Sequence, residues 1–386
     1  MENQNVLIAG AGIGGLATAI ALATDGHTID VIEQTPEPKP IGAGISLQPN
    51  AMQCLHRLGV DEQVKSKTDE VLNGQIRKSD GTVLRRLDFS HYKTRYGHAP
   101  CTITRSDLFE ILHHTAIERG VQVHFDQQIT NVKQQPIGVT VSTSTNDFHG
   151  DLLVGADGVH STVRSLTFGD RKDRYSGYQC WRGLTSDSFA LKNVDCMTEY
   201  WGTKSRFGCM RCSRERVYWY ATLDRSDPNE QVHDWYESFM DWQPIVSQII
   251  SKTKVEKIHA SPIIDCAPSR SWYEGKIVLV GDAAHPMTPN LGQGGAQAIE
   301  DAIVLALSLR TRGDLTRAFE SYASHRYPRT TDITKTARLI GSIGQGSSWW
   351  KRLVRDQVIG RLPPSLMARG LHKQFDVQDH LNSFKH

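Results

Sequence analysis

The 386-residue sequence lacks a strong excess of charge of either sign. Its 44 lysines and arginines nearly balance its 42 aspartates and glutamates, which leaves a formal net charge of +2. We therefore expect neither nucleic acid nor an acidic membrane to attract the whole chain. The sequence also lacks fixed-period repeats and low-complexity tracts, which excludes a solenoid and a long disordered linker. Its length is sufficient for two domains with a substantial core.

Cysteine is sparse, and metal-binding patterns are missing. The seven cysteines are an odd number and are scattered along the chain, which predicts reduced thiols in a cytoplasmic protein. Cys209 and Cys212 form one C-x-x-C pattern, but no second pattern accompanies it and no βα unit lies near it. The sixteen histidines include no H-x-x-x-H pair. We expect neither a zinc site nor a disulfide, and no bound metal.

Only one long apolar run is present, at residues 6–24, and it contains no charged residue. Its length is about that of a segment that crosses a bilayer. However, glycine occupies four of the six positions 10–15, and no basic residue precedes the run. The run therefore predicts a strand, a turn and a helix, rather than a membrane span or a signal peptide.

A nucleotide-binding motif lies inside this run. A short apolar strand at residues 5–9 leads into Gly10-Ala11-Gly12-Ile13-Gly14-Gly15, a helix follows, and a second strand at 28–32 ends at Glu33. This is the G-x-G-x-x-G pattern in its proper setting. The glycines let backbone amides approach a pyrophosphate at the start of a helix, and Glu33 would accept hydrogen bonds from ribose hydroxyls. FAD or NAD is the expected ligand, and a purely structural turn explains neither the glycine density nor Glu33.

A second glycine-rich segment, residues 38–50, follows Glu33 directly and contains Gly44 and Ser46. Simple NAD-binding units continue here with plain βα repeats. FAD enzymes need additional loops around the ribityl chain and the isoalloxazine ring. This segment therefore favours FAD.

The organising motif of the chain comes late, at residues 275–301. A buried strand at 277–280 leads to Asp282, then to a loop with Pro286 and Pro289, and then to a glycine-rich helix start. Asp282 is expected to accept hydrogen bonds from ribityl hydroxyls. The amides that open the helix are expected to face the pyrimidine edge of the flavin, where charge develops on reduction. An ordinary glycine-rich helix start is the alternative.

The middle of the chain supplies further candidates. An amphipathic helix is predicted at 106–119, and Arg105 precedes it, where a cation opposes the helix dipole. Arg105 is expected to hold a phosphate or the flavin edge, with a surface arginine as the alternative. Strands are predicted at 121–125, 137–142 and 152–154. Asp157 follows the last of them, in a turn where a solvent-facing aspartate would also fit.

Residues 175–264 differ in composition and pattern from the chain before them. They are rich in aromatic residues and alternate between apolar and polar positions. This pattern predicts an antiparallel sheet, interrupted by a long helix at 232–250. We interpret the segment as a second domain that covers the cofactor and forms the wall of a pocket.

Together, three motifs resemble the fingerprints of the single-component FAD-dependent aromatic hydroxylases, which have the p-hydroxybenzoate hydroxylase fold. The motifs are Gly10–Gly15 with Glu33, Gly155-Ala156-Asp157-Gly158, and Gly281-Asp282-Ala283-Ala284-His285-Pro286. Within that group the chain is most similar to urate hydroxylases and 2-alkyl-4-quinolone 3-hydroxylases. The segments 177–182, 200–206, 288–295 and 371–375 carry this likeness.

The resemblance implies an α/β (α+β) fold with a discontinuous Rossmann-type FAD-binding domain, a smaller antiparallel-sheet substrate domain and C-terminal helices. The FAD-binding domain would comprise residues 1–75, 98–174 and 265–330, the substrate domain 76–97 and 175–264, and the helical region 331–386. The chain would bind FAD without a covalent bond. It would use NAD(P)H and oxygen to hydroxylate a small aromatic or heteroaromatic molecule through a flavin C4a-hydroperoxide.

The resemblance also implies the site residues. Arg206 would stabilise an anionic substrate or the hydroperoxide, and Tyr218 would hydrogen-bond a ring heteroatom; a surface arginine and a core tyrosine are the alternatives. The expected cofactor-binding residues are Gly12, Gly14, Gly15, Glu33, Gly44, Ser46, Arg105, Ile129, Asp157, Asp282, Pro289, Gly292, Gly294, Gly295 and Ala296.

Several alternatives stay open at this point. Residues 347–370 have a basic amphipathic pattern that predicts either contact with a membrane surface or packing at a domain interface. The enzyme could instead epoxidise or inactivate a polycyclic natural product, or it could be a redox protein that binds FAD without oxygenating anything. The substrate, the choice between NADH and NADPH, and a monomeric or homodimeric state are not determined by the sequence.

Overall fold

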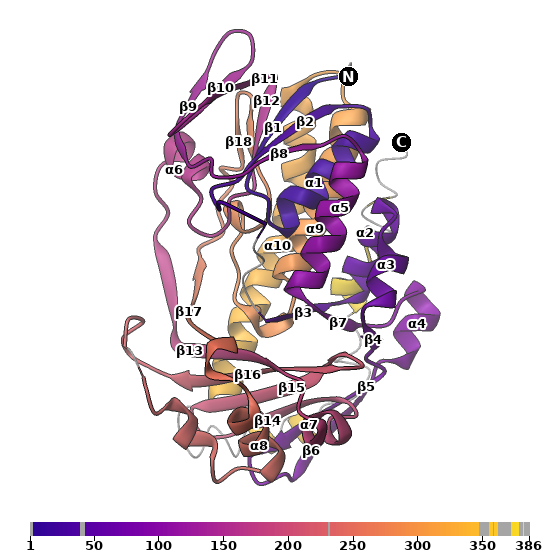
Figure 1. The fold of residues 1–386 in the computed structure, drawn as a ribbon, viewed down its shortest axis with the longest axis vertical. Helices are drawn as coiled ribbons and strands as arrows, with labels where there is room; N and C mark the ends of the chain where they lie inside the picture. The colour runs from indigo at the N-terminus through magenta and orange to yellow at the C-terminus, as the bar shows by residue number, and fades with distance from the viewer. Residues whose placement is uncertain are drawn as a thin grey trace.

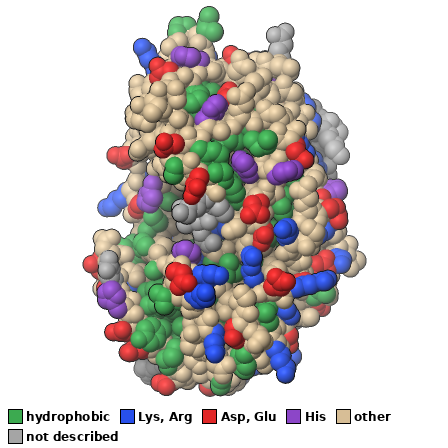
Figure 2. Space-filling model, viewed as in Figure 1, with side chains coloured by type: hydrophobic (Ala, Val, Ile, Leu, Met, Phe, Trp, Pro, Cys, Tyr) green, Lys and Arg blue, Asp and Glu red, His purple; other side chains and the backbone are tan. Residues whose placement is uncertain are grey.

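The computed structural model describes residues 3–38, 43–230, 232–346, 355–357, 359–361, 372–377 and 381. Two large sheets occupy opposite ends of the molecule, and helices pack between and around them (Figure 1). On the face shown in Figure 2, basic and acidic side chains are interspersed, as the small net charge leads one to expect.

The first sheet assembles strands that are far apart in sequence. Its order is β18 (Tyr273–Glu274), β19 (Ile277–Leu279), β12 (Leu152–Gly155), β1 (Asn5–Ala9), β2 (Thr28–Ile32) and β8 (Gln122–His124). All neighbouring strands are parallel except β18 and β19. The central strands are almost fully buried and mostly apolar, as parallel strands covered on both faces must be. The two ends of the chain therefore build one sheet.

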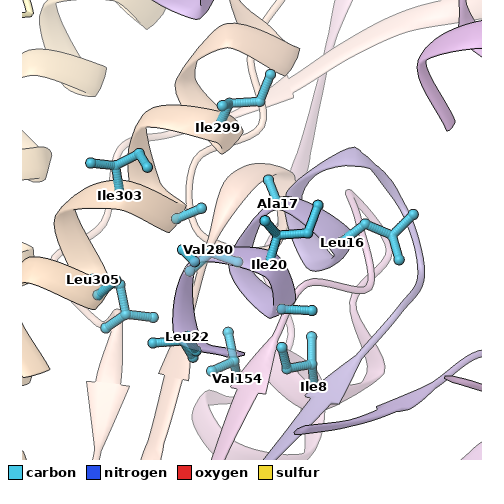
Figure 3. Close-up of a cluster of buried hydrophobic side chains, with 14 of the residues drawn as sticks. Ile8, Leu16, Ala17, Ile20, Leu22, Val154, Val280, Ile299, Ile303 and Leu305 are labelled. Atoms are coloured by element: carbon cyan, nitrogen blue, oxygen red, sulfur yellow. The ribbon is translucent and has the colours of Figure 1, made fainter. Parts of the chain in front are cut away.

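Helices α1 (Ile13–Thr24), α5 (Arg105–Glu118) and α9 (Gly294–Thr311) pack around this sheet. Figure 3 shows the core between them, where Leu16 and Ile20 of α1 lie near Ile299 and Ile303 of α9. This packing brings the N-termini of α1 and α9 together. The predicted strand, helix and strand of the first 32 residues are confirmed, and the helix predicted at 106–119 is confirmed to within one residue.

The second sheet is mostly antiparallel, as predicted for residues 175–264. Its order is β17 (Ile258–Cys266), β13 (Asp173–Thr185), β16 (Arg216–Asp224), β15 (Ser205–Ser213), β14 (Met197–Trp201), β5 (Asn73–Lys78) and β6 (Val83–Asp88). Only β14 and β5 are parallel neighbours. Strands β5 and β6 come from the N-terminal part of the chain. The division into domains stays a prediction.

The two faces of this sheet differ in chemistry because side chains alternate along each strand. One face, the outer face, is an apolar core in which Trp181, Phe207 and Trp219 pack under α7 (Ser188–Asn193), η1 (Trp235–Phe239) and α8 (Pro244–Lys252). The opposite face, here called the inner face, carries Tyr178, Arg182, Glu199, Arg206, Tyr218 and Tyr220. The inner face is turned toward the first sheet and its helices.

The prediction of one long helix at 232–250 is wrong. The structure has the 3-10 turn η1 and then the separate helix α8, with Gln243 in an extended conformation between them. Pro244 starts α8, and a residue before proline is pushed out of the helical region.

Two small sheets and several further helices complete the described part of the fold. Strands β3 (Gly44–Leu47), β7 (Cys101–Thr104) and β4 (Asp69–Glu70) form one three-stranded sheet, and β9 (Ile129–Gln134), β10 (Val139–Thr143) and β11 (Asp147–Gly150) form another. The remaining helices are α2 (Pro49–Leu58), α3 (Asp61–Ser66), α4 (Ser90–Tyr96), α6 (Thr162–Phe168) and the 31-residue α10 (Leu315–Gln345). Helix α10 runs from the first sheet, where the Tyr322 hydroxyl donates to the Leu279 carbonyl, to the inner face of the second.

Most of the basic amphipathic stretch at 347–370 lies outside the described residues. Within it, Arg355 is described and is buried, with its guanidinium 4.9 Å from the centre of the Trp201 ring. No helix among the described residues has the length and apolar character needed to cross a membrane.

Candidate functional site

The N-terminal glycine motif forms a tight turn at the end of β1. Gly10 has φ +97°, and a Cβ at Gly15 would lie 1.9 Å from the Gly10 carbonyl oxygen, so neither position accepts a side chain. A Cβ at Gly14 would lie 3.2 Å from Ala298 of α9. Gly12 differs, because it is the N-cap of α1 without a side-chain cap, and apart from its chain neighbours no atom of the described residues lies within 4 Å of where its Cβ would be. The first amides of α1 therefore face open space.

The late motif forms a second turn of the same kind. Gly281 has φ +60°, and its amide donates to the Asp301 carboxylate at 2.7 Å. Asp282 follows, and its Oδ1 lies 4.0 Å from the position of a Cβ on Gly294, the first residue of α9. Helix α9 has no side-chain cap and no acidic residue in its first turn, so its amides are free to meet a negatively charged or electron-rich group.

Asp282 is exposed to water but surrounded at longer range by protein. This burial raises the pKa of the Asp282 carboxyl, and the nearby charges of His285 and Arg105 oppose the rise. Arg105 is itself exposed, and its amide donates to the Ala43 carbonyl at 2.9 Å. Asp282 and Arg105 are therefore close enough for their charges to interact.

Glu33 and the segment leading to Ile129 lie together at the end of β2. The Glu33 carboxylate accepts hydrogen bonds from the amides of Ala11, at 2.7 Å, and Thr35, at 2.8 Å. The Gln127 amide donates to the Glu33 carbonyl at 2.9 Å, and β9 begins two residues later at Ile129. Glu33 therefore holds the glycine turn in place.

Strand β3 lies between the late motif and the inner face. A Cβ at Gly44 would lie 2.5 Å from the Tyr218 ring, so glycine is needed where the strand crosses that ring. A Cβ at Gly292 would lie 3.5 Å from Ser46, and one at Gly295 would lie 2.6 Å from Ile45. Pro289 is in the 3-10 turn η4 (Pro289–Leu291), and Ala296 is buried in the first turn of α9.

Asp157 is directed toward α6. Its carboxylate accepts from the Ser161 hydroxyl and from the Val163 amide at 3.0 Å, and the Ser161 oxygen caps α6 by accepting from Arg164. Burial raises the pKa of Asp157. Asp157 also lies beside the first motif, because a Cβ at Gly10 would be 3.0 Å from its Cα. Its predicted contact with the cofactor stays a prediction.

Arg206 lies on the inner face, is only 3% exposed, and has three hydrogen-bond partners. It donates to Gln345 at 2.9 Å, to Glu199 at 3.2 Å and to Asn290 at 2.7 Å. Burial alone would lower the pKa of Arg206, but the Glu199 carboxylate raises it, so the guanidinium stays charged. Arg206 is therefore a buried, charge-paired residue, and not the surface arginine of the alternative interpretation.

Sequence reasoning missed the residues that surround Arg206. Asn290 bonds Tyr178, Thr288 and the Ala337 carbonyl besides Arg206, and so joins η4, β13, β15 and α10. A cavity of about 270 Å³ opens beside this cluster. Its lining includes Tyr178, Asn290, Gln345, Asp224, Arg338 and Ser176. Asn290 could have been singled out from its place in the late motif, but no local pattern marks Gln345.

Tyr218 is almost fully buried on the inner face. Burial raises its pKa to about 12, so its hydroxyl is protonated at neutral pH and available as a hydrogen-bond donor. It lies against β3, which places it between the cofactor-side elements and the sheet.

Behind the late motif lies a buried polar cluster that the sequence did not reveal. Glu300 binds Arg326 at 2.6 Å and Arg329 at 2.7 Å, and Asp301 binds Arg326 at 2.6 Å and His285 at 2.6 Å. Since Asp301 also accepts from the Gly281 amide, the cluster anchors the turn that carries Asp282.

Acid is expected to weaken this cluster. Burial would raise the pKa of Glu300, but Arg329 and Arg326 lower it to about 2, below the ordinary value of 4.5. A carboxyl group whose pKa is lower in the folded than in the unfolded protein stabilises the fold at pH values above its unfolded pKa. This contribution is lost as the pH falls toward the folded pKa. The free energy of unfolding should therefore drop by on the order of 3 kcal/mol between about pH 5 and 2. Urea titrations across this range measure it, and a Glu300→Gln variant should show a flatter dependence.

These features together fit a flavin dinucleotide. Two uncapped helix N-termini meet on one side of the first sheet, glycines keep the approach to α1 open, and a carboxylate lies beside α9. Helix N-termini of this kind suit a pyrophosphate and the electron-rich edge of a ring. No group of three or more metal-ligating side chains occurs among the residues described.

Comparisons with known proteins agree with this geometry. A family model described as the FAD binding domain matches residues 3–337. The chain is 36% identical to the aurachin C monooxygenase/isomerase of Stigmatella aurantiaca, over 92% of this chain and 93% of that one. It is 30% identical to the 2-heptyl-3-hydroxy-4(1H)-quinolone synthase of Pseudomonas aeruginosa, over 96% and 97%. The crystal structure of Klebsiella pneumoniae HpxO complexed with FAD and uric acid superposes with a TM-score of 0.88 at 29% identity, covering 96% of each chain.

Proposed function

The chain belongs to the FAD binding domain family, that of the flavin-dependent aromatic hydroxylases predicted from its motifs, and from this premise we propose where its substrate and cofactor lie. The protein is a monooxygenase that binds FAD and uses NAD(P)H. The substrate is a flat heteroaromatic molecule, held between the start of α9 and the inner face of the second sheet. We call this space the substrate chamber. The observation that carries the proposal is the polar and aromatic inner face, which is turned toward two open helix starts.

The cofactor is held by the residues predicted from the motifs. The amides of Gly12, Gly14 and Gly15 meet the pyrophosphate, and Glu33 meets a ribose. Asp282 accepts from the ribityl chain, and the amides of residues 292–296 face the flavin. When bound, FAD supplies electron transfer from NAD(P)H and the activation of oxygen. The protein supplies orientation and excludes water from the chamber.

Tyr218 and Arg206 contribute differently to the chamber. The protonated Tyr218 hydroxyl donates a hydrogen bond to a ring heteroatom. Arg206 keeps two N–H groups beyond its three contacts, and its charge is balanced by Glu199. It holds η4 and α10 against the sheet as well as supporting the bound ring. The names of the relatives, which concern a quinolone and aurachin C, favour a heteroaromatic substrate.

The test asks whether an aromatic compound accelerates NAD(P)H consumption and is itself oxygenated. Purified FAD-loaded protein is mixed with NAD(P)H and a panel of quinolones, purines and phenols, and oxygen uptake is followed together with product mass. A ring that accelerates NAD(P)H consumption and gains one oxygen atom supports the proposal. Cofactor reduction that no ring accelerates would favour the non-oxygenating FAD protein instead.

Replacing Arg206 with Gln should uncouple the reaction. Loss of a charged hydrogen-bond donor costs about 1.5–3 kcal/mol, so hydroxylated product per NAD(P)H consumed should fall roughly tenfold while hydrogen peroxide rises. Product and peroxide are measured together. The control is Arg214→Gln, since Arg214 lies in an exposed turn and should keep its coupling. Unchanged coupling in Arg206→Gln would remove Arg206 from this role.

The assembly state, a cytoplasmic location and a membrane contact through residues 347–370 stay predictions. Sedimentation of the full chain with anionic liposomes tests the membrane contact. Sedimentation velocity without lipid distinguishes a monomer from a homodimer.

A further inference from the structure

The charged side chains of the inner face are not all paired with a group of opposite charge. Arg206 is paired with Glu199 at 3.2 Å, and this pair is neutral as a unit. Asp224 lies at the end of β16 and accepts from the Gln345 amide at 2.7 Å. Arg216 of β16 also lies on this face and is paired with Asp107 at 3.6 Å. A further charged side chain of the face is Arg182 on β13, which faces Tyr220 across the strand pairing.

Arg182 has no acidic partner. Its guanidinium donates to the Ser261 hydroxyl at 2.9 Å and also hydrogen-bonds Tyr218, and it forms no ion pair with a carboxylate of the described residues. The titratable side chains that act on it most strongly are Cys180, Tyr218 and Tyr178, which are neutral at pH 7. Arg182 is nonetheless only partly exposed. A guanidinium that is largely removed from water and lacks a counter-charge destabilises a fold.

The position of Arg182 indicates which kind of ligand would supply a negative charge to its guanidinium. It projects from the same face as Tyr218, whose ring lies against Gly44 of β3. The Tyr218 hydroxyl stays protonated and hydrogen-bonds Arg182, so a charged donor and a neutral donor lie side by side on the inner face. A planar guanidinium matches the two oxygens of a carboxylate and also binds a single ionised ring oxygen.

We propose that Arg182 and Tyr218 form an oxyanion-binding site in the substrate chamber, and that the aromatic substrate binds there through a carboxylate or an ionised ring oxygen. The inference rests on the proposed function, because it assumes that the chamber holds a ring. It moves the anion-binding role from Arg206, whose charge is already balanced, to Arg182. An ionised oxygen conjugated with a ring also enriches that ring in electrons, which favours attack by an activated oxygen.

The test uses two probes of one shape, benzoate and benzamide, with FAD-loaded protein. Their dissociation constants are measured from the perturbation of flavin absorbance and by calorimetry. The wild type should bind benzoate at least tenfold more tightly than benzamide. Arg182→Gln should abolish this preference, Arg182→Lys should keep part of it, and the exposed-turn control Arg214→Gln should keep all of it.

Thermal unfolding without a ring ligand gives an independent readout. Removing an unpaired charge should leave the midpoint of Arg182→Gln unchanged or raised, whereas removal of a structural cation would lower it. Equal binding of the two probes by the wild type, a preference that survives in Arg182→Gln, or a lowered midpoint would each overturn the inference alone. Failure of the wild type to bind either probe would contradict the aromatic chamber, and therefore the proposed function as well.

Discussion

A Gly12→Ala variant is expected to fold as the wild type does but to bind FAD about 10- to 100-fold more weakly, because forcing an extra methyl into a close contact costs roughly 1–3 kcal/mol. The backbone of Gly12 is extended, with φ −73°, so any residue can adopt it. Apart from the chain neighbours of Gly12, no atom of the part of the chain that the structure describes lies within 4 Å of the position of the new methyl group. That open space is the approach to the uncapped amides of α1. The dissociation constant of FAD is measured by flavin fluorescence, and the stability of the FAD-free protein by thermal unfolding.

Two other glycines make this prediction specific. Gly313 lies between α9 and α10, and among the residues described none but its chain neighbours comes within 4 Å of the position that an added Cβ would take. Gly313→Ala should therefore change neither the FAD dissociation constant nor the stability. Gly15→Ala should lower stability even without FAD, because its methyl would lie 1.9 Å from the Gly10 carbonyl oxygen. If Gly12→Ala retained full FAD affinity, or unfolded as easily as Gly15→Ala, the approach to α1 would not be the pyrophosphate site.

The cofactor side of the protein was largely predictable because its signals are local. In each of the two motifs, a short apolar strand, glycines and a helical pattern together determine one turn. The structure has both turns, at Gly10 and at Gly281. The acidic residue after β2, Glu33, is also where the motif requires it, and it holds the glycine turn through the Ala11 amide. Its contact with a ribose stays a prediction. The family and FAD followed from the order of these motifs.

The chamber was less predictable because its contacts are made between distant parts of the chain. Arg206 and Gln345 are 139 residues apart, and nothing in the periodicity of α10 indicates that its last residue faces a sheet. Alternation along β13 and β16 predicted two faces but not which face would carry the charges. The wrong helix at 232–250 has a local cause, since the effect of Pro244 on the residue before it was overlooked.

Glu300→Gln is expected to lower the free energy of unfolding by about 3–5 kcal/mol, the usual cost of breaking a buried ion pair by removing one partner. Glu300 is fully buried and accepts from Asn50, Gln297, Arg326 and Arg329. An amide of the same size keeps the shape but leaves Arg326 with Asp301 as its carboxylate partner and removes the carboxylate that binds Arg329. Urea unfolding of the FAD-loaded protein measures the loss.

The matched control is Asp332→Asn, which makes the same chemical change in an exposed ion pair. Asp332 and Lys373 are 2.8 Å apart and both face solvent, so the loss should be below about 1 kcal/mol. FAD affinity should separate the two variants as well. Asp301 shares Arg326 with Glu300 and also fixes the Gly281 amide, so loosening the cluster should shift the turn that carries Asp282. Equal stability losses in the two variants would contradict the buried ion pair's contribution to folding, and equal FAD affinities would show that the cluster does not anchor this turn.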